Sequence, residues 1–151
     1  MTTDLPLPLR INSELAERIR AHGAEGYPNE ICGALLGRDD GEIRDVLALF
    51  PLQNQREDSP HNRFSITSGD VRRAERSAQE QHLDVLGWYH SHPDHPSRPS
   101  EFDREHAWPG YSYVILSVVA RQPAAMTSWR LFDDRSGYQE ETIVITERVA
   151  P

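Results

Sequence analysis

Four of the seven histidines in this chain lie within 17 positions, at His90, His92, His95 and His106. His90 and His92 belong to an apolar segment that predicts a strand, and alternate residues of a strand point to the same face of a sheet. Two imidazole rings at such positions can bind one metal ion. Pro93 favours an extended backbone at His92, which supports the same geometry. The pair therefore indicates a metal site.

A third ligand is available a short distance along the chain. Ser100 and Asp103 are three residues apart at the start of a predicted short helix, so both side chains project from one face of it. If the 93–99 loop turns back, this face meets the histidine pair. Two histidines and one carboxylate leave a position for water, which is typical of a catalytic zinc site rather than a closed structural site. Such a site promotes attack of water on a carbonyl group, and it still needs a general base from elsewhere in the chain.

The spacing of these residues also matches a known motif. The segment from His90 to Asp103 reproduces the pattern H-x-H-x(7)-S-x(2)-D, and on these residues the chain resembles the JAMM (MPN-plus) metallopeptidases. The strings GWYHSHP at 87–93 and YPNEICGALLG at 27–37 are similar to the corresponding segments of that family. The resemblance runs from about Glu14 to Val119 in the order of the family.

The resemblance implies a role for each of five residues. His90, His92 and Asp103 are expected to bind one zinc ion per chain. Glu30 occupies the position of the family's upstream glutamate and is expected to take a proton from the attacking water and give it to the leaving amine. Ser100 is expected to stabilise the oxyanion. The implied activity is hydrolysis of a peptide or isopeptide bond. In the compact stand-alone bacterial members, the implied substrates are ubiquitin-like or sulfur-carrier proteins cut after a C-terminal Gly-Gly.

Simpler roles remain open for some of these residues. Ser100 and Asp103 also fit a helix capping box, although a hydroxyl can accept a backbone N–H and still donate its own proton. An ordinary loop carboxylate is the simpler role for Glu30, and Glu25 is a rival for the base. Cys32 is expected to be a buried structural residue, although it could approach the site.

Three other functions fit parts of the sequence. The segment from His90 to His95 matches the H-x-H-x-D-H pattern of the metallo-β-lactamase superfamily, but those binuclear hydrolases need more ligands downstream, where only His106 remains. Asp94 and His95 are therefore expected to be solvent-facing loop residues or supports of the metal ligands. A zinc deaminase is excluded because its Cys-x-x-Cys pair is absent. A non-catalytic scaffold or protein-binding module of the same fold stays open, although such scaffolds have lost the metal ligands that this chain retains.

The elements around these residues predict an α/β domain of the α+β type, in which a mostly antiparallel mixed sheet is flanked by helices. The resemblance implies the cytidine-deaminase-like MPN fold. Strands are expected at 31–37, 43–50, 83–92, 111–119, 126–133 and 137–146. Helices are expected at 12–23, capped by Ser13 and ended by Gly23, at 68–82, capped by Ser68 or Asp70, and at 100–106. A turn is expected at 39–41, and loops at about 53–63 and at 93–99.

Composition limits the class of protein. The 151 residues suffice for one core, which predicts a single domain over 1–151. Asp and Glu number 24 against 16 cationic residues, all of them arginine, so the formal net charge is −8. This balance, without a basic cluster, argues against a nucleic-acid partner.

One cysteine excludes an internal disulfide. The lack of a long apolar run or a signal peptide predicts a cytoplasmic protein with no membrane partner. The oligomeric state stays open.

Overall fold

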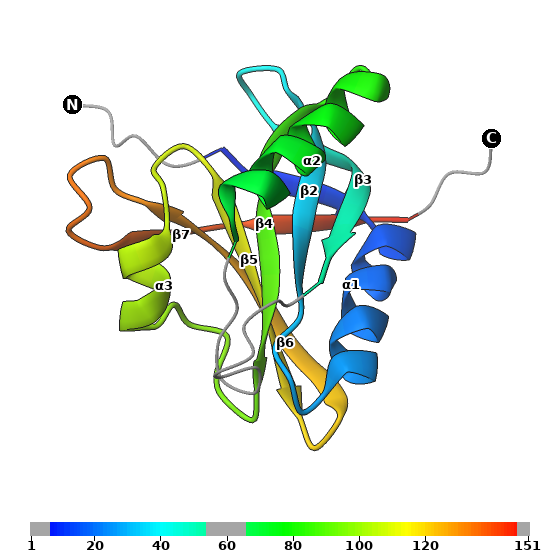
Figure 1. Cartoon of the computed structure of the whole chain (residues 1–151), viewed down its shortest axis with the longest axis vertical. Coiled ribbons are helices and arrows are strands. Elements are labelled where there is room, and N and C mark those ends of the chain that lie inside the picture. The colour runs from blue at the N-terminus through cyan, green and yellow to red at the C-terminus, as the bar shows by residue number, and fades with distance from the viewer. Residues whose placement is uncertain (1–6, 54–65, 148–151) are drawn as a thin grey trace.

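The computed structural model describes residues 7–53 and 66–147, which form a single mixed sheet with three helices around it (Figure 1). The strands are β1 (Leu9–Asn12), β2 (Cys32–Asp39), β3 (Arg44–Leu52), β4 (Asp84–Pro93), β5 (Ser112–Val119), β6 (Gln122–Leu131), β7 (Tyr138–Glu141) and β8 (Ile143–Thr146). The helices are α1 (Ser13–Gly26), α2 (Ser68–Glu80) and α3 (Glu101–His106). The sheet order is β7-β6-β5-β4-β2-β3-β1-β8.

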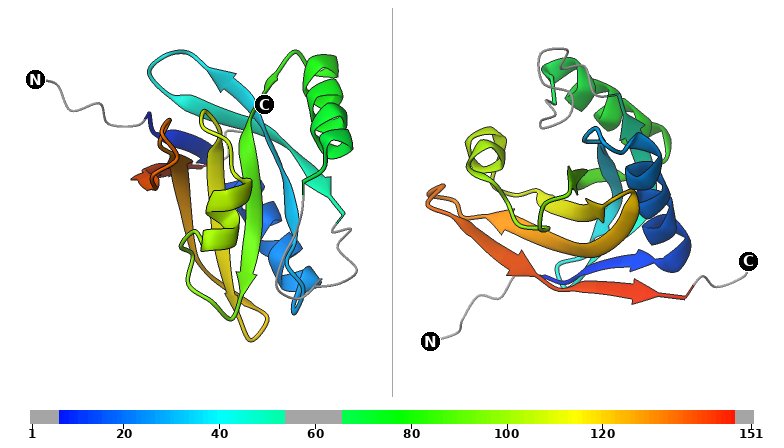
Figure 2. Two further views of the ribbon diagram at one scale, coloured as in Figure 1. Left: turned by 60° about the vertical axis from the view of Figure 1, so that its left-hand side comes forward. Right: turned by 90° about the horizontal axis from the view of Figure 1, so that it is seen from below.

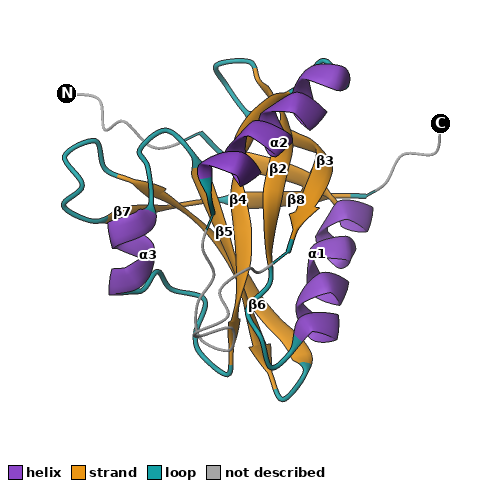
Figure 3. Ribbon diagram, in the orientation of Figure 1, coloured by secondary structure: helices purple, strands orange, loops and turns teal. Residues whose placement is uncertain are grey.

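The predicted fold class is confirmed. The pairs β2–β3, β2–β4, β5–β6 and β6–β7 are antiparallel, whereas β1–β3, β1–β8 and β4–β5 are parallel. The sheet is therefore mixed and mostly antiparallel, as predicted. Figure 3 shows α3 near β7, on the opposite side of the molecule from α1. None of the described helices combines the length and the apolar character that a membrane crossing requires.

The two faces of the sheet bury two separate cores, because neighbouring strand residues point to opposite faces. On one face, α1 packs with Ile19 against Tyr89 and other apolar residues of the sheet. On the other face, α2 packs with Ala74 against a group that includes Trp88 and Cys32. The two helices are seen on different sides of the sheet in Figure 2. The alternation along β4 therefore directs Trp88, and the even-numbered residues after it, to the α2 face.

The strand that carries the two predicted histidine ligands, β4, lies in the interior of the sheet, with β2 on one side and β5 on the other. Gly87 allows the close approach of β5, because a Cβ atom at this position would lie 1.9 Å from the carbonyl oxygen of Ser112. Only glycine fits at such a distance. Both edges of β4 are thus fixed, and the residues at its C-terminal end have a defined orientation.

Both longer helices begin with caps that differ from the prediction. The N-cap of α1 is Asn12, whose side chain accepts the N–H of Leu15, rather than Ser13. This helix also continues past Gly23 to Gly26. The N-cap of α2 is Thr67, whose hydroxyl accepts the N–H of Asp70 at 3.0 Å. In both cases the residue before the predicted cap has the extended backbone of an N-cap, so the predicted cap falls inside the helix.

The strand predictions failed at the two ends of the described chain. The short strand β1 was not predicted, and it pairs in parallel with both β3 and β8. The predicted strand 137–146 is two strands, β7 and β8, separated by Thr142. They lie at opposite edges of the sheet, where β7 pairs with β6 and β8 pairs with β1. The predicted loop at 53–63 lies almost wholly outside the described residues, and the single domain over 1–151 stays a prediction.

Candidate metal site

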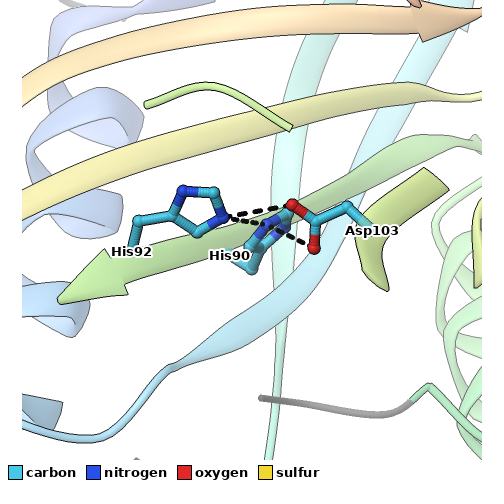
Figure 4. A group of neighbouring side chains, drawn as sticks. All are labelled: His90, His92 and Asp103. Carbon is cyan, nitrogen blue, oxygen red and sulfur yellow. Dashed lines mark hydrogen bonds and ion pairs between the residues drawn. The ribbon is translucent and has the colours of Figure 1, made fainter. Parts of the chain in front are cut away.

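Two elements bring the predicted ligands together. His90 and His92 point from the C-terminal end of β4 to the α2 face, and Asp103 comes from α3 (Figure 4). The helix begins after Ser100, whose Oγ accepts the N–H of Asp103 at 3.0 Å. In return, Asp103 Oδ2 accepts the N–H of Ser100 at 2.8 Å. This capping box fixes the Asp103 carboxylate relative to its helix.

The far end of α3 is held by the β6–β7 connection. The Arg135 guanidinium donates to the carbonyl oxygens of Ala107 at 2.7 Å, Arg104 at 3.1 Å and Glu105 at 3.3 Å. These carbonyls are the groups that a helix leaves without intrahelical partners at its C-terminal end. The short helix is thus fixed at both ends, and its carboxylate is held against β4.

The ligand atoms have the spacing of a metal site. His90 Nε2 lies 3.1 Å from His92 Nε2 and 3.4 Å from Asp103 Oδ1, and His92 Nε2 lies 3.1 Å from Asp103 Oδ2. Zinc bonds of ~2.0–2.1 Å in tetrahedral geometry place neighbouring ligand atoms about 3.3 Å apart. The two Nε2 atoms and the Asp103 carboxylate therefore converge at the spacing of neighbouring zinc ligands. In the described part of the chain, these residues form the one group of at least three side chains with this convergence.

The protonation states of the three side chains suit a metal ion. His92 Nδ1 lies 2.8 Å from the carbonyl oxygen of Pro96. Because a carbonyl only accepts, this nitrogen carries the proton and Nε2 is left with its lone pair. Burial lowers the pKa of His90, which favours its neutral ring. Burial works to raise the pKa of Asp103, but the interactions with His90 and the hydrogen bonds from His92 and the Ser100 N–H outweigh it and lower that pKa. Neutral imidazoles and an ionised carboxylate are the ligand forms of these groups.

Glu30 lies two residues before β2 and is only 6% exposed. The N–H of Ile31 donates to Ser91 Oγ at 2.9 Å, and the N–H of Ser91 donates to the Ile31 carbonyl at 3.0 Å. Cys32 is the cross-strand partner of His90. Continuing this antiparallel register places Glu30 opposite His92, on the same face of the sheet. The rival Glu25 is exposed on α1.

The other predicted residues have these positions. Ser100 is exposed at the start of α3, and its Oγ already accepts a backbone N–H. Its hydroxyl hydrogen thus remains available for donation. Cys32 is fully buried, as expected of a structural cysteine, and burial raises the pKa of its thiol to about 12. The catalytic roles of Glu30 and Ser100 and the ligand roles of the three convergent residues stay predictions.

A cavity of 460 Å³ adjoins the ligands and was not predicted. His90 and Asp103 form part of its wall. Much of the remaining wall is apolar or aromatic, with contributions from Ile66, Trp108, Tyr113, Ile115 and Tyr138. These residues come from separate elements that only the fold brings together. No local signal in the sequence marks them as one site.

Comparison with protein-family profiles and comparison with individual proteins give results that agree with each other. The profile described as prokaryotic homologs of the JAB domain matches residues 12–132. A Haloferax volcanii protein named desampylase is 33% identical over 121 residues, covering 77% of this chain and 85% of the relative. A Thermus thermophilus protein named probable TtuB-protein conjugate cleaving protease is 32% identical, covering 74% and 72%. A Mycobacterium tuberculosis protein named CysO-cysteine peptidase is 26% identical, covering 93% and 92%.

Solved structures share the same fold. The solution structure of a Desulfitobacterium hafniense protein superposes with a TM-score of 0.82 and 32% identity, covering 93% of this chain and 94% of that protein. A JAMM protein described as having a metalloprotease-like zinc site superposes with a TM-score of 0.55 over 93% of this chain and 99% of its own. Its identity is 19%, so this likeness concerns the fold alone. The three predicted metal ligands lie within the segment that the family profile matches.

Proposed function

Because this chain belongs to the family of prokaryotic homologs of the JAB domain, we propose that it is a zinc-dependent isopeptidase that acts after the C-terminal Gly-Gly of a ubiquitin-like or sulfur-carrier protein. It is a peptidase of the JAMM type, like the relatives named above. The observation that carries the metal chemistry is the convergence of His90 Nε2, His92 Nε2 and the Asp103 carboxylate, with nitrogen–nitrogen and nitrogen–oxygen distances of 3.1–3.4 Å. Support for the substrate class comes from the names of the relatives.

The proposed mechanism divides the work between the ion and the chain. A zinc ion held by His90, His92 and Asp103 would supply a Lewis acid that lowers the pKa of a coordinated water and polarises the scissile carbonyl. Glu30 would accept the proton of the attacking water and pass it to the leaving amine. Ser100 would donate its hydroxyl hydrogen to the carbonyl oxygen as negative charge develops there.

The order of the strands supports a position in the site for each half of the substrate, the leaving amine and the acyl tail. Glu30 lies on the β2 side of β4, so the leaving amine that receives its proton must lie on that side. The cavity lies on the other side, where Tyr113 and Ile115 of β5 and Tyr138 of β7 form its wall. The acyl half of the substrate, which is the tail that ends in Gly-Gly, therefore extends toward the cavity. A side chain that precedes the two glycines would fill it.

This arrangement limits where an extended tail could pair with a strand. The strand that carries the two histidines, β4, has partners on both sides. Among the described strands, the edge near the site is β7, whose Tyr138 lines the cavity. Of the described strands, β7 is therefore the one at which an extended tail beside the site could pair through its backbone.

Loss of the Tyr138 ring is expected to weaken tail binding more than chemistry. Tyr138→Ala removes part of the cavity wall but no proposed ligand or base, so KM should rise about tenfold while kcat changes little. Steady-state kinetics on a conjugate with a full-length tail measures both constants. Phe132→Ala is the matched control, because Phe132 is an exposed aromatic residue on the same hairpin that does not line the cavity. A fall in kcat alone would contradict the assignment of the tail to the cavity.

The proposed function is tested directly by cleavage of a defined conjugate. We expect the purified full chain to separate a ubiquitin-like protein from a lysine side chain joined to its C-terminal Gly-Gly, as measured by mass spectrometry. A chelator should abolish cleavage, and added zinc should restore it. Conjugates whose tail is one glycine shorter are the control for the position of the cleaved bond. If metal-loaded protein leaves every conjugate intact, the proposal is wrong and a scaffold of the same fold is favoured.

A further inference from the structure

The loop that carries the proposed general base is held at two places, by β4 and by the residue that follows this strand. At its C-terminal end, the reciprocal hydrogen bonds between Ile31 and Ser91 attach it one residue before His92. At its N-terminal end, the Tyr27 hydroxyl donates to Asp94 Oδ2 at 2.5 Å, two residues after His92. The two attachments thus lie on either side of a proposed metal ligand.

Asp94 is itself fixed by the neighbouring strands. Its backbone N–H donates to the Val118 carbonyl at 2.7 Å, and its Oδ1 accepts the N–H of Ala120 at 2.9 Å. Its φ of 58° lies in the left-handed region, which Asp and Asn adopt more readily than most residues. One carboxylate oxygen therefore binds the β5–β6 turn while the other binds Tyr27. Asp94 is exposed, as expected of a solvent-facing loop residue, and its role as a support of the metal ligands stays a prediction.

Tyr27 is placed to use this carboxylate. Its ring packs against the core on the α1 face, and the Arg121 guanidinium carbon lies 5.6 Å from its centroid. The hydrogen bond raises the pKa of Tyr27 and lowers the pKa of Asp94, so the donor stays protonated and the acceptor stays ionised. The ring and the hydroxyl thus have separate contacts, and the hydroxyl can be removed without removing the packing.

Resting on the proposed function, we propose that the Tyr27–Asp94 hydrogen bond is a positioning latch that holds Glu30 beside His92. The residues between Tyr27 and Glu30 have a further backbone bond, from the N–H of Asn29 to the carbonyl of Gly26 at 2.9 Å, but it leads back to α1 and not to β4. Among the hydrogen bonds described for residues 27–31, the bonds between Ile31 and Ser91 are the ones that still join this loop to β4 when the latch is removed. Proton transfer depends steeply on such placement, whereas ligand binding at the metal does not involve this loop.

The test removes one hydroxyl group. Tyr27→Phe is expected to lower kcat about tenfold, with KM and zinc content unchanged. Added to Glu30→Gln, the same substitution should lower kcat no further, because the latch acts through that carboxylate. Tyr111→Phe is the matched control, since Tyr111 is a half-buried tyrosine outside the proposed site. Asp94→Asn keeps an oxygen acceptor and tolerates the left-handed backbone, so it should retain more activity than Tyr27→Phe.

A readout other than turnover comes from cobalt substitution. The pH at which the visible spectrum of the cobalt form changes should shift in Tyr27→Phe in the same direction as in Glu30→Gln, because the first substitution moves the Glu30 carboxylate away from the metal and the second removes its charge. A Tyr27→Phe variant with wild-type kcat and spectrum would overturn the latch while leaving the proposed function intact. A further tenfold loss in the Glu30→Gln background would also overturn it. Failure of Glu30→Gln itself to lower kcat would instead overturn the proposed base.

Discussion

A Glu30→Gln variant is expected to bind as much zinc as the wild-type protein and to lose about 10³-fold in kcat. The amide keeps the size of the side chain, but it can neither take a proton from water nor give one to the leaving amine. Zinc should be retained because His90, His92 and Asp103 already supply three ligand atoms at the spacing of a tetrahedral site. Elemental analysis and steady-state kinetics on the same preparation measure both quantities.

Glu25→Gln is the matched control for this experiment. Glu25 is the nearest rival carboxylate in the sequence, but it is exposed on α1, whereas Glu30 is buried beside β4. The control should keep wild-type kcat. Loss of zinc from Glu30→Gln would place Glu30 among the metal ligands, and equal activity losses in the two variants would exclude a specific base at either position.

The second large effect, on zinc content and activity, is expected when a proposed metal ligand is removed. Wild-type protein purified without added metal should contain about one zinc ion per chain, and His92→Ala should contain almost none and show no measurable cleavage. His92 supplies one of the three proposed ligands, and its ring is oriented by the carbonyl of Pro96. Removal of this ring leaves two ligands, too few for a stable site. Asp103→Asn tests a second ligand while keeping an oxygen that can accept the helix-capping N–H.

His95→Ala is the matched control for the ligand variants. His95 is an exposed histidine three residues along the same segment, and the hydrogen bonds described for it use only its backbone. It should keep both zinc and activity. Wild-type protein without metal, even after incubation with zinc, would contradict the peptidase assignment. Metal retained by His92→Ala would mean that the ion binds elsewhere.

The residues of the site were predictable because their signals are local. Alternation along a strand was enough to place His90 and His92 on one face, and the Ser100–Asp103 spacing indicated the capping box that the structure contains. The position of Glu30 relative to His92 could not be obtained in this way. It depends on the register between β2 and β4, which is set by pairing across about 60 residues of sequence. Only the resemblance to a family indicated Glu30 in advance.

The errors in the fold have the same physical origin. The segment around Leu9 contains two prolines and has no clear strand signal, yet it becomes a strand because β3 and β8 offer partners on both sides. The residues around Thr142 alternate like one strand, but the sheet places their two halves at opposite edges. Neither outcome is encoded in local periodicity. The cavity beside the site is likewise formed by side chains from distant segments, including Trp108 and Tyr138.

The double use of Asp103 has a thermodynamic consequence. Its carboxylate both caps α3 and faces the histidines, and a helix of six residues is too short to be stable by itself. On the proposed ligand set, ordering of α3 and binding of the ion would be linked equilibria, and part of the free energy of metal binding would offset the cost of ordering the helix. A substitution that favours the unwound form of residues 100–106 will lower the apparent metal affinity even when all three ligands remain in the chain.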